Sequence, residues 1–178
     1  MNIPNILTLI RILLIPVFTY EVIFEDNFFA AGLILVVSGL TDCLDGYIAR
    51  KFNMITTAGK VLDPIADKLT QIMTVLCLAL KGFSLMWILF SFLVIKDFAL
   101  LLGGVSIYKN QDMVVSSNWY GKLATIIFYV AVIIIIFFYK EIPDLFKNII
   151  AGFVIITMFV SFIGYICYFF SIRNKKIQ

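Results

Sequence analysis

Four aspartates stand close together in the stretch DCLDGYIARKFNMITTAGKVLDPIAD, which covers residues 42–67. If the residues before position 51 form a helix, one stripe of it combines acidic, small and basic residues at spacings of three and four: Asp42, Asp45, Gly46, Ala49 and Arg50. A helix beginning near residue 59 would carry a second such stripe: Gly59, Asp63 and Asp67. Because the short loop makes these helices antiparallel neighbours, we expect the stripes to face each other and the four carboxylates to converge.

Carboxylates that share a site repel each other, so such a cluster needs positive charge nearby. Arg50 and Lys68 could supply part of it. Divalent cations would supply more, and carboxylate oxygens in a chain without histidine suit Mg²⁺, Mn²⁺ or Ca²⁺ rather than zinc or copper. Four residues are therefore candidate ligands for one ion or two bridged ions: Asp42, Asp45, Asp63 and Asp67. Paired ions of this kind clamp phosphoryl oxygens during an in-line displacement.

Small residues share the acidic stripes. Gly46, Ala49 and Gly59 leave little or no side chain beside the carboxylates. They could leave room for a flat or bulky ligand against the backbone, or they could serve close packing of helices in the membrane. Their position next to the acids favours clearance for a ligand.

The surrounding composition places these acids in a membrane protein. Of 178 residues, 62% are hydrophobic and 14% are charged, whereas soluble domains are roughly half apolar and a quarter charged. Since a spanning helix needs about 20 mainly apolar residues, six spans can be drawn. They cover residues 6–24, 28–50, 59–80, 83–108, 121–138 and 145–172. We predict an all-α integral membrane protein whose single domain covers residues 1–178, with no nucleic-acid partner.

The distribution of lysine and arginine predicts the orientation, because these residues favour the cytoplasmic side. Eight of them lie at one set of helix ends: Arg50, Lys51, Lys60, Lys109, Lys122, Arg173, Lys175 and Lys176. The opposite ends hold three: Lys81, Lys140 and Lys147. Both termini and the acidic stretch are therefore expected on the cytoplasmic side of a cell membrane (inner or plasma membrane).

The pattern D-x2-D-G-x2-A-R-x8-G-x3-D-x3-D runs from Asp42 to Asp67 without a departure, and it resembles the signature of the CDP-alcohol phosphatidyltransferases. The opening IPNILTLIRILLIPVF and the segment LDPIADKL extend the resemblance along the chain. It implies the six-helix membrane fold of that family. It also implies transfer of a phosphatidyl group from CDP-diacylglycerol to an alcohol, with release of CMP.

The resemblance implies a role for each residue of the pattern. Asp42, Asp45 and Asp63 would be ligands of a divalent metal, Mg²⁺ or Mn²⁺, as two ions. Asp67 would complete the metal site and take the proton of the acceptor hydroxyl. The remaining positions would bind the CDP-lipid: Gly46, Ala49 and Gly59 would admit the cytidine diphosphate, with Arg50 near its phosphates. Family members are commonly homodimers.

Fewer residues of the sequence indicate where the acceptor alcohol binds. The candidates are Lys96 and Asp97 in the fourth span and Lys122 in the stretch GKLAT. Phosphatidylglycerophosphate synthases of the family usually carry an Arg-Glu pair and two lysines in G-K-x-K-T, whereas this pattern is more like that of its cardiolipin synthases. A phosphate monoester would require more cations than remain here. We therefore predict phosphatidylglycerol as acceptor, with glycerol 3-phosphate as the alternative.

Other interpretations remain for these residues and for the chain. Lys96 and Asp97 could form a buried ion pair, and Lys122 could be an interfacial lysine that extends to the headgroups. Thr8 and Arg11 of the first span are weaker candidates for approaching the donor phosphates. A cation transporter could also place acids at membrane depth, but it would not need the glycine, alanine and arginine beside them.

Overall fold

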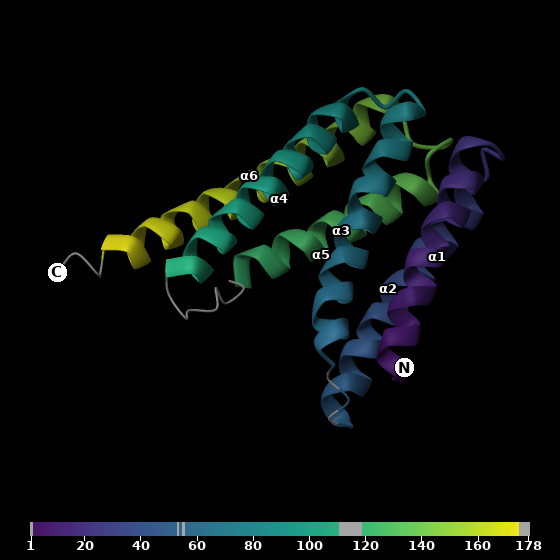
Figure 1. Cartoon of the computed structure of the whole chain (residues 1–178). Coiled ribbons are helices and arrows are strands. Elements are labelled where there is room, and N and C mark those ends of the chain that lie inside the picture. The colour runs from purple at the N-terminus through teal and green to yellow at the C-terminus, as the bar shows by residue number, and fades with distance from the viewer. Residues whose placement is uncertain (1, 53, 55, 111–118, 175–178) are drawn as a thin grey trace. The chain divides into compact units, whose positions relative to one another are not determined.

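A computed structural model describes residues 2–52, 54, 56–110 and 119–174, and the described residues form six helices and no strand (Figure 1). The helices are α1 (Ile3–Ile23), α2 (Phe28–Lys51), α3 (Thr57–Leu80), α4 (Leu85–Asn110), α5 (Trp119–Phe137) and α6 (Asp144–Asn174). Each coincides with one of the six predicted segments, with ends that differ by three residues or fewer. The predicted all-α class is confirmed. Lys175 and Lys176, which contributed to the predicted orientation, lie outside the described residues.

The contacts divide the chain into two compact units. The first contains Met1–Phe90 together with Ile136–Tyr139, and the second contains Ser91–Ile135 together with Lys140–Gln178. The four aspartates belong to the first unit, and the residues predicted to bind the acceptor belong to the second. The interpretation of residues 1–178 as one domain stays a prediction.

Local sequence signals explain where the helices of the first unit begin. Pro4 lies in the first turn of α1, where a missing backbone N–H costs nothing. The side chain of Asn27 caps α2 by accepting a hydrogen bond from Ala30 N at 3.2 Å. Thr56 caps α3 in the same way, since its Oγ1 accepts from Gly59 N at 2.9 Å.

Helix α1 is the central element of the first unit, because it packs against both α2 and α3. Its apolar contribution to the core includes Phe18 and Val22, which are buried with Leu35 of α2 and with Val75 and Leu78 of α3. Burial of these side chains fixes the position of α1 relative to both partners. The polar residues of α1 are thereby held against those of α2 and α3.

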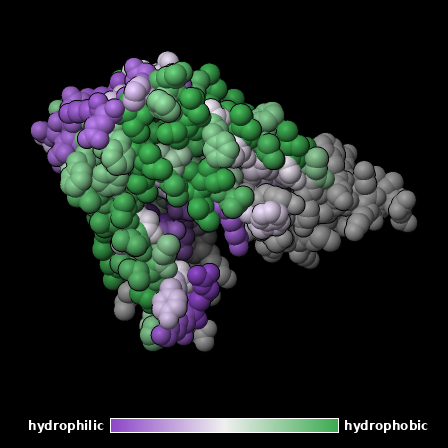
Figure 2. All heavy atoms as spheres, turned by 180° about the vertical axis from the view of Figure 1, so that it is seen from behind, coloured by the Kyte–Doolittle hydropathy of each residue, from purple (hydrophilic) through white to green (hydrophobic). Residues whose placement is uncertain are grey.

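Apolar side chains also cover much of the surface, as expected in a membrane. Figure 2 shows hydrophobic residues over most of the visible helix surface and hydrophilic residues gathered over the α1–α2 turn. Within the described part of the chain, three stretches are long and apolar enough to span a bilayer: Pro4–Ile23, Phe28–Lys51 and Asp144–Cys167. Gly121–Phe137 is apolar but shorter. The prediction that the other helices also span the membrane is not tested by these lengths.

Candidate active site

Arg11 of α1 lies at the centre of the acidic residues. Its guanidinium is only 1% exposed, and it forms ion pairs with carboxylates of both neighbouring helices. Nη1 lies 2.5 Å from Asp42 Oδ1 and 3.4 Å from Asp67 Oδ1, and Nη2 lies 2.5 Å from Asp45 Oδ2. One arginine therefore joins two acids of α2 to one acid of α3.

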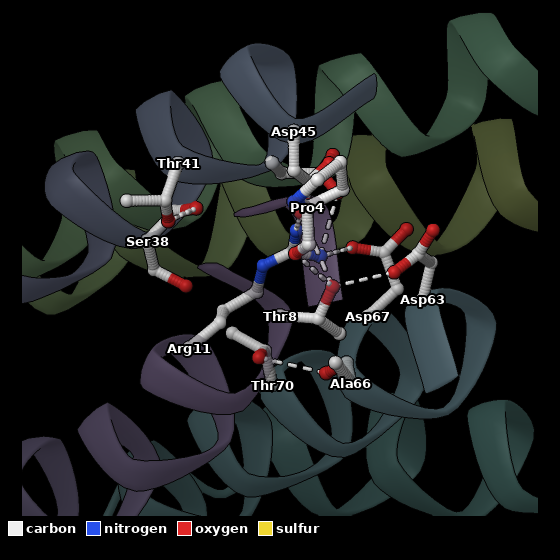
Figure 3. Close-up of polar contacts among 11 residues, drawn as sticks. Pro4, Thr8, Arg11, Ser38, Thr41, Asp45, Asp63, Ala66, Asp67 and Thr70 are labelled. Atoms are coloured by element: carbon white, nitrogen blue, oxygen red, sulfur yellow. Dashed lines mark hydrogen bonds and ion pairs between the residues drawn. The ribbon is translucent and has the colours of Figure 1, made fainter. Parts of the chain in front are cut away.

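Thr8, one helical turn before Arg11, contacts the fourth acid. Its hydroxyl donates to Asp63 Oδ1 at 2.6 Å and lies 3.4 Å from Asp45 Oδ2. Figure 3 shows Thr8 and Arg11 pointing into the space between Asp45 on one side and Asp63 and Asp67 on the other. The contacts that bring the two acidic stripes together thus run through α1. From the sequence we had expected the acidic stripes of α2 and α3 to face each other directly.

The cluster has a buried side and an open side. Arg11 and Asp45 are almost completely buried, whereas the side chains of Asp42 and Asp67 are 42% and 41% exposed. A ligand approaching from the open side would meet these two carboxylates first. The four carboxylates, three of them paired with the guanidinium, carry a formal excess of three negative charges over Arg11, so the cluster still favours cations.

The small residues beside the acids differ in how much space surrounds them. A Cβ atom added to Gly46 would meet Arg50 Nη2 at 3.6 Å, an ordinary contact. A Cβ atom added to Gly59 would lie 2.9 Å from Asn5 Oδ1 and 3.0 Å from Thr56 Oγ1. A methyl group would therefore fit beside Gly46, whereas the space beside Gly59 is taken by Asn5 of α1 and by Thr56. Ala49 is partly exposed and Arg50 is exposed.

The arrangement of the acidic side chains bears on metal binding. Among the described residues, no three or more histidine, cysteine, aspartate or glutamate side chains are arranged to hold a metal ion. The donor chemistry nevertheless suits a hard divalent cation, since the site offers carboxylate oxygens and an excess of negative charge.

The predicted acceptor residues lie in the second unit. Lys96 Nζ is 3.3 Å from Asp97 Oδ1, and Asp97 is buried. This is the ion pair that the sequence left open as an alternative interpretation. Lys122 is exposed, near the start of α5. The positive charge of Lys96 is thus partly engaged within the chain.

The role of Arg11 as ion-pair partner of the acids is the feature of the site that the sequence revealed least. From the sequence, Arg50 and Lys68 were candidates to offset part of the acidic charge, and Arg11 was only a weaker candidate for approaching the donor phosphates. One signal pointed to a larger role: Arg11 is a charged residue in the middle of an apolar run, and such a residue normally faces a polar interior. Which acids it meets could not be inferred from that signal.

Comparison with known proteins identifies the family to which the chain belongs. The model of the CDP-alcohol phosphatidyltransferase family matches residues 1–166, a range that includes all four aspartates and Arg11. A protein of Aquifex aeolicus named CDP-diacylglycerol–glycerol-3-phosphate 3-phosphatidyltransferase is 35% identical over 127 residues, which are 71% of this chain and 70% of that protein. A Haemophilus influenzae protein of the same name is 31% identical over 129 residues, covering 70% of this chain and 69% of that protein.

A further relative carries a different name. A Schizosaccharomyces pombe fusion protein, named cardiolipin synthase (CMP-forming) / mitochondrial hydrolase, is 38% identical over 112 residues, which are 63% of this chain and 18% of that protein. The chain belongs to the CDP-alcohol phosphatidyltransferase family. It is therefore an enzyme of membrane phospholipid biosynthesis, as the motif from Asp42 to Asp67 predicted.

Proposed function

We propose that the protein transfers a phosphatidyl group from CDP-diacylglycerol to a glycerol-type alcohol and releases CMP. The supporting observation is that Asp42, Asp45 and Asp67 gather on one buried arginine, with Asp63 held by the adjacent Thr8. These acids make up the family pattern, and the family match includes all of them. We place the reaction at the cytoplasmic face of the cell membrane, because of the basic residues at the same helix ends.

The reaction exchanges one ester partner of a phosphorus atom. The acceptor hydroxyl oxygen forms a bond to the phosphorus that bears the diacylglycerol, and the bond from that phosphorus to the CMP oxygen breaks. Bound divalent cations, Mg²⁺ or Mn²⁺ as two ions, would neutralise charge on the diphosphate. Asp42, Asp45, Asp63 and Asp67 are the residues that would hold them.

We assign Asp67 as the base that takes the acceptor proton. A base must reach the incoming hydroxyl, so it has to lie on the open side of the cluster. Asp45 is buried against Arg11 and does not meet this condition. Asp42 is exposed to the same degree, but its Oδ1 lies 2.5 Å from Arg11 Nη1. The corresponding distance from Asp67 Oδ1 to Arg11 Nη1 is longer, at 3.4 Å. Asp67 is therefore both accessible and less tightly paired with the arginine.

We assign the donor nucleotide to the stripe of α2. Gly46 has space for a ligand beside it, Ala49 adds only a methyl group, and Arg50 offers an exposed guanidinium for the phosphates. Gly59 contributes through the start of α3, where its missing side chain lets α1 approach.

We propose phosphatidylglycerol as the acceptor, which would make the product cardiolipin. Its phosphodiester carries one negative charge. Of the two candidate acceptor-binding lysines, Lys96 is paired with Asp97, and Lys122, in GKLAT, is exposed. Glycerol 3-phosphate is the second candidate, because the Aquifex aeolicus and Haemophilus influenzae relatives bear names that specify it. The name of the Schizosaccharomyces pombe relative supports the first candidate.

The test is product identification. Purified protein in detergent would receive CDP-diacylglycerol and Mg²⁺ with phosphatidylglycerol, glycerol 3-phosphate or no acceptor, followed by lipid mass spectrometry and measurement of CMP. Cardiolipin is the expected product, and phosphatidylglycerophosphate would move the assignment to the second candidate. No CMP with either acceptor, together with cation flux in liposomes, would overturn the proposed transfer. Light scattering of the same sample would test the homodimer that the family resemblance implies.

A further inference from the structure

We propose that Arg11 is the positioning residue of the acidic site, acting as a permanent buried cation that holds acids of two helices in place. The comparisons and the family pattern assign it no such role. The inference draws on the proposed function only for the effect of Mg²⁺. The pairing of Arg11 with the acids is independent of the reaction.

The shape of the guanidinium suits this role. Arg11 uses both terminal nitrogens: Nη2 contacts Asp45 of α2, and Nη1 contacts Asp42 of α2 together with Asp67 of α3. A lysine has one ammonium group and cannot span three carboxylates as a planar fork does. Arg11 thus fixes the position of each acid from the buried side, while Asp42 and Asp67 stay partly exposed on the other.

The third nitrogen of the guanidinium faces a different environment. Arg11 Nε is buried, and it has no hydrogen-bond partner among the described residues. Arg11 borders a cavity of about 10 Å³ that is also lined by the hydroxyl-bearing residues Ser38, Thr70 and Thr74. This volume is close to the minimum that one water molecule requires.

Two of the threonines that line this cavity are hydrogen-bonded to the backbone of α3. Thr70 Oγ1 donates its proton to Ala66 O at 2.9 Å, and Thr74 Oγ1 donates to Thr70 O at 2.7 Å. Both oxygens therefore offer lone pairs to a further donor.

The charges explain why the site needs this residue. With Arg11 the cluster has a formal excess of three negative charges, and without it the excess is four. Asp45 would then be left buried without its cation, which is strongly destabilising. A divalent ion could offset part of this charge. Loss of Arg11 should therefore make the stability of the protein depend on divalent cations.

The experiment is a double-mutant cycle on the full chain in detergent, comparing wild type, Arg11→Gln, Asp45→Asn and the double variant by thermal unfolding in chelator and in Mg²⁺. Arg11→Gln is expected to lower Tm in chelator by on the order of 10 °C. Mg²⁺ should raise the Tm of Arg11→Gln more than it raises that of wild type. Adding Asp45→Asn should recover part of the loss in chelator, because it removes the unpaired charge.

The matched control is Lys81→Gln, which breaks an ion pair with Asp26 at the opposite end of the same unit. Its Tm should be the same in chelator and in Mg²⁺ and should not respond to Asp45→Asn. Recovery of Arg11→Gln by Asp45→Asn, without recovery by Mg²⁺, supports the role of Arg11 and counts against the metal part of the proposed function.

An unchanged Tm in Arg11→Gln overturns the inference. So does a loss that neither Mg²⁺ nor Asp45→Asn reduces, since that outcome would show that Arg11 serves only packing. If Arg11→Gln does not fold in chelator, the double variant decides the question, because it should fold where the single variant does not.

Discussion

Gly46 and Gly59 each lie four residues from an aspartate of the acidic pattern, yet substitution by alanine should change the stability of the protein in opposite directions at the two positions. At Gly46 a methyl group meets only the end of the Arg50 side chain, at 3.6 Å. At Gly59 it meets Asn5 Oδ1 and Thr56 Oγ1 at 2.9 and 3.0 Å. These two atoms cannot easily move, because they belong to a chain of hydrogen bonds from Gly59 N to Thr56 Oγ1 and on to Asn5 Oδ1.

The magnitude follows from these contacts. Gly59→Ala disturbs a helix cap worth about 1 kcal/mol, and the overpacking adds roughly 1–3 kcal/mol. The better helix propensity of alanine offsets at most about 1 kcal/mol of this loss. The net loss is about 2 kcal/mol, whereas Gly46→Ala should gain up to about 1 kcal/mol, because it adds the same propensity without a clash. For a chain of this size the difference of about 3 kcal/mol corresponds to roughly 6–12 °C in Tm.

Two measurements on each variant separate stability from binding. Thermal unfolding in detergent should place Gly59→Ala below wild type and Gly46→Ala at or slightly above it. The KM for CDP-diacylglycerol should rise at least about tenfold in Gly46→Ala, because its methyl group would enter the space assigned to the nucleotide. The reasoning is refuted if Gly59→Ala is as stable as Gly46→Ala. An unchanged KM in Gly46→Ala would refute the assignment of that space to the donor.

Three further predictions concern the acids, the metal and the acceptor. Asp63→Asn should lower kcat by at least about 100-fold, because the amide cannot replace a charged carboxylate as a metal ligand, and CMP release measures this. Treatment with a chelator should abolish CMP release, and Mg²⁺ or Mn²⁺ should restore it, as checked by titration of the metal. Lys122→Ala should raise the acceptor KM about tenfold or more through loss of a charge-assisted hydrogen bond, while the KM for CDP-diacylglycerol stays constant.

Matched controls accompany these predictions. Lys140→Ala removes a lysine from the opposite set of loop ends and should leave the acceptor KM unchanged. Wild-type turnover in Asp63→Asn would remove that residue from the metal site. Full activity in chelator would remove the cation from the reaction. If Lys122→Ala leaves the acceptor KM unchanged, Lys122 serves only as an interfacial anchor.

Much of the fold was predictable because its signals are local. Apolar runs of spanning length and the polar breaks between them predicted six helices with ends within three residues of those observed. The spacing of the acids on α2 and α3 is also local, because residues three or four apart share a helix face. The family follows from the same stretch, since the whole acidic pattern lies within residues 42–67.

The membrane class, the six helices and the acidic pattern with its chemistry follow from residue types and their spacing along the chain. Helix packing, in contrast, places α1 against both acidic helices and makes Arg11, rather than Arg50, the ion-pair partner of the acids. Packing also fills the space beside Gly59 with Asn5, whereas a methyl group would fit beside Gly46. The physical reason is that these contacts join residues more than 30 positions apart. Their partners depend on how whole helices pack, and no local spacing records that arrangement.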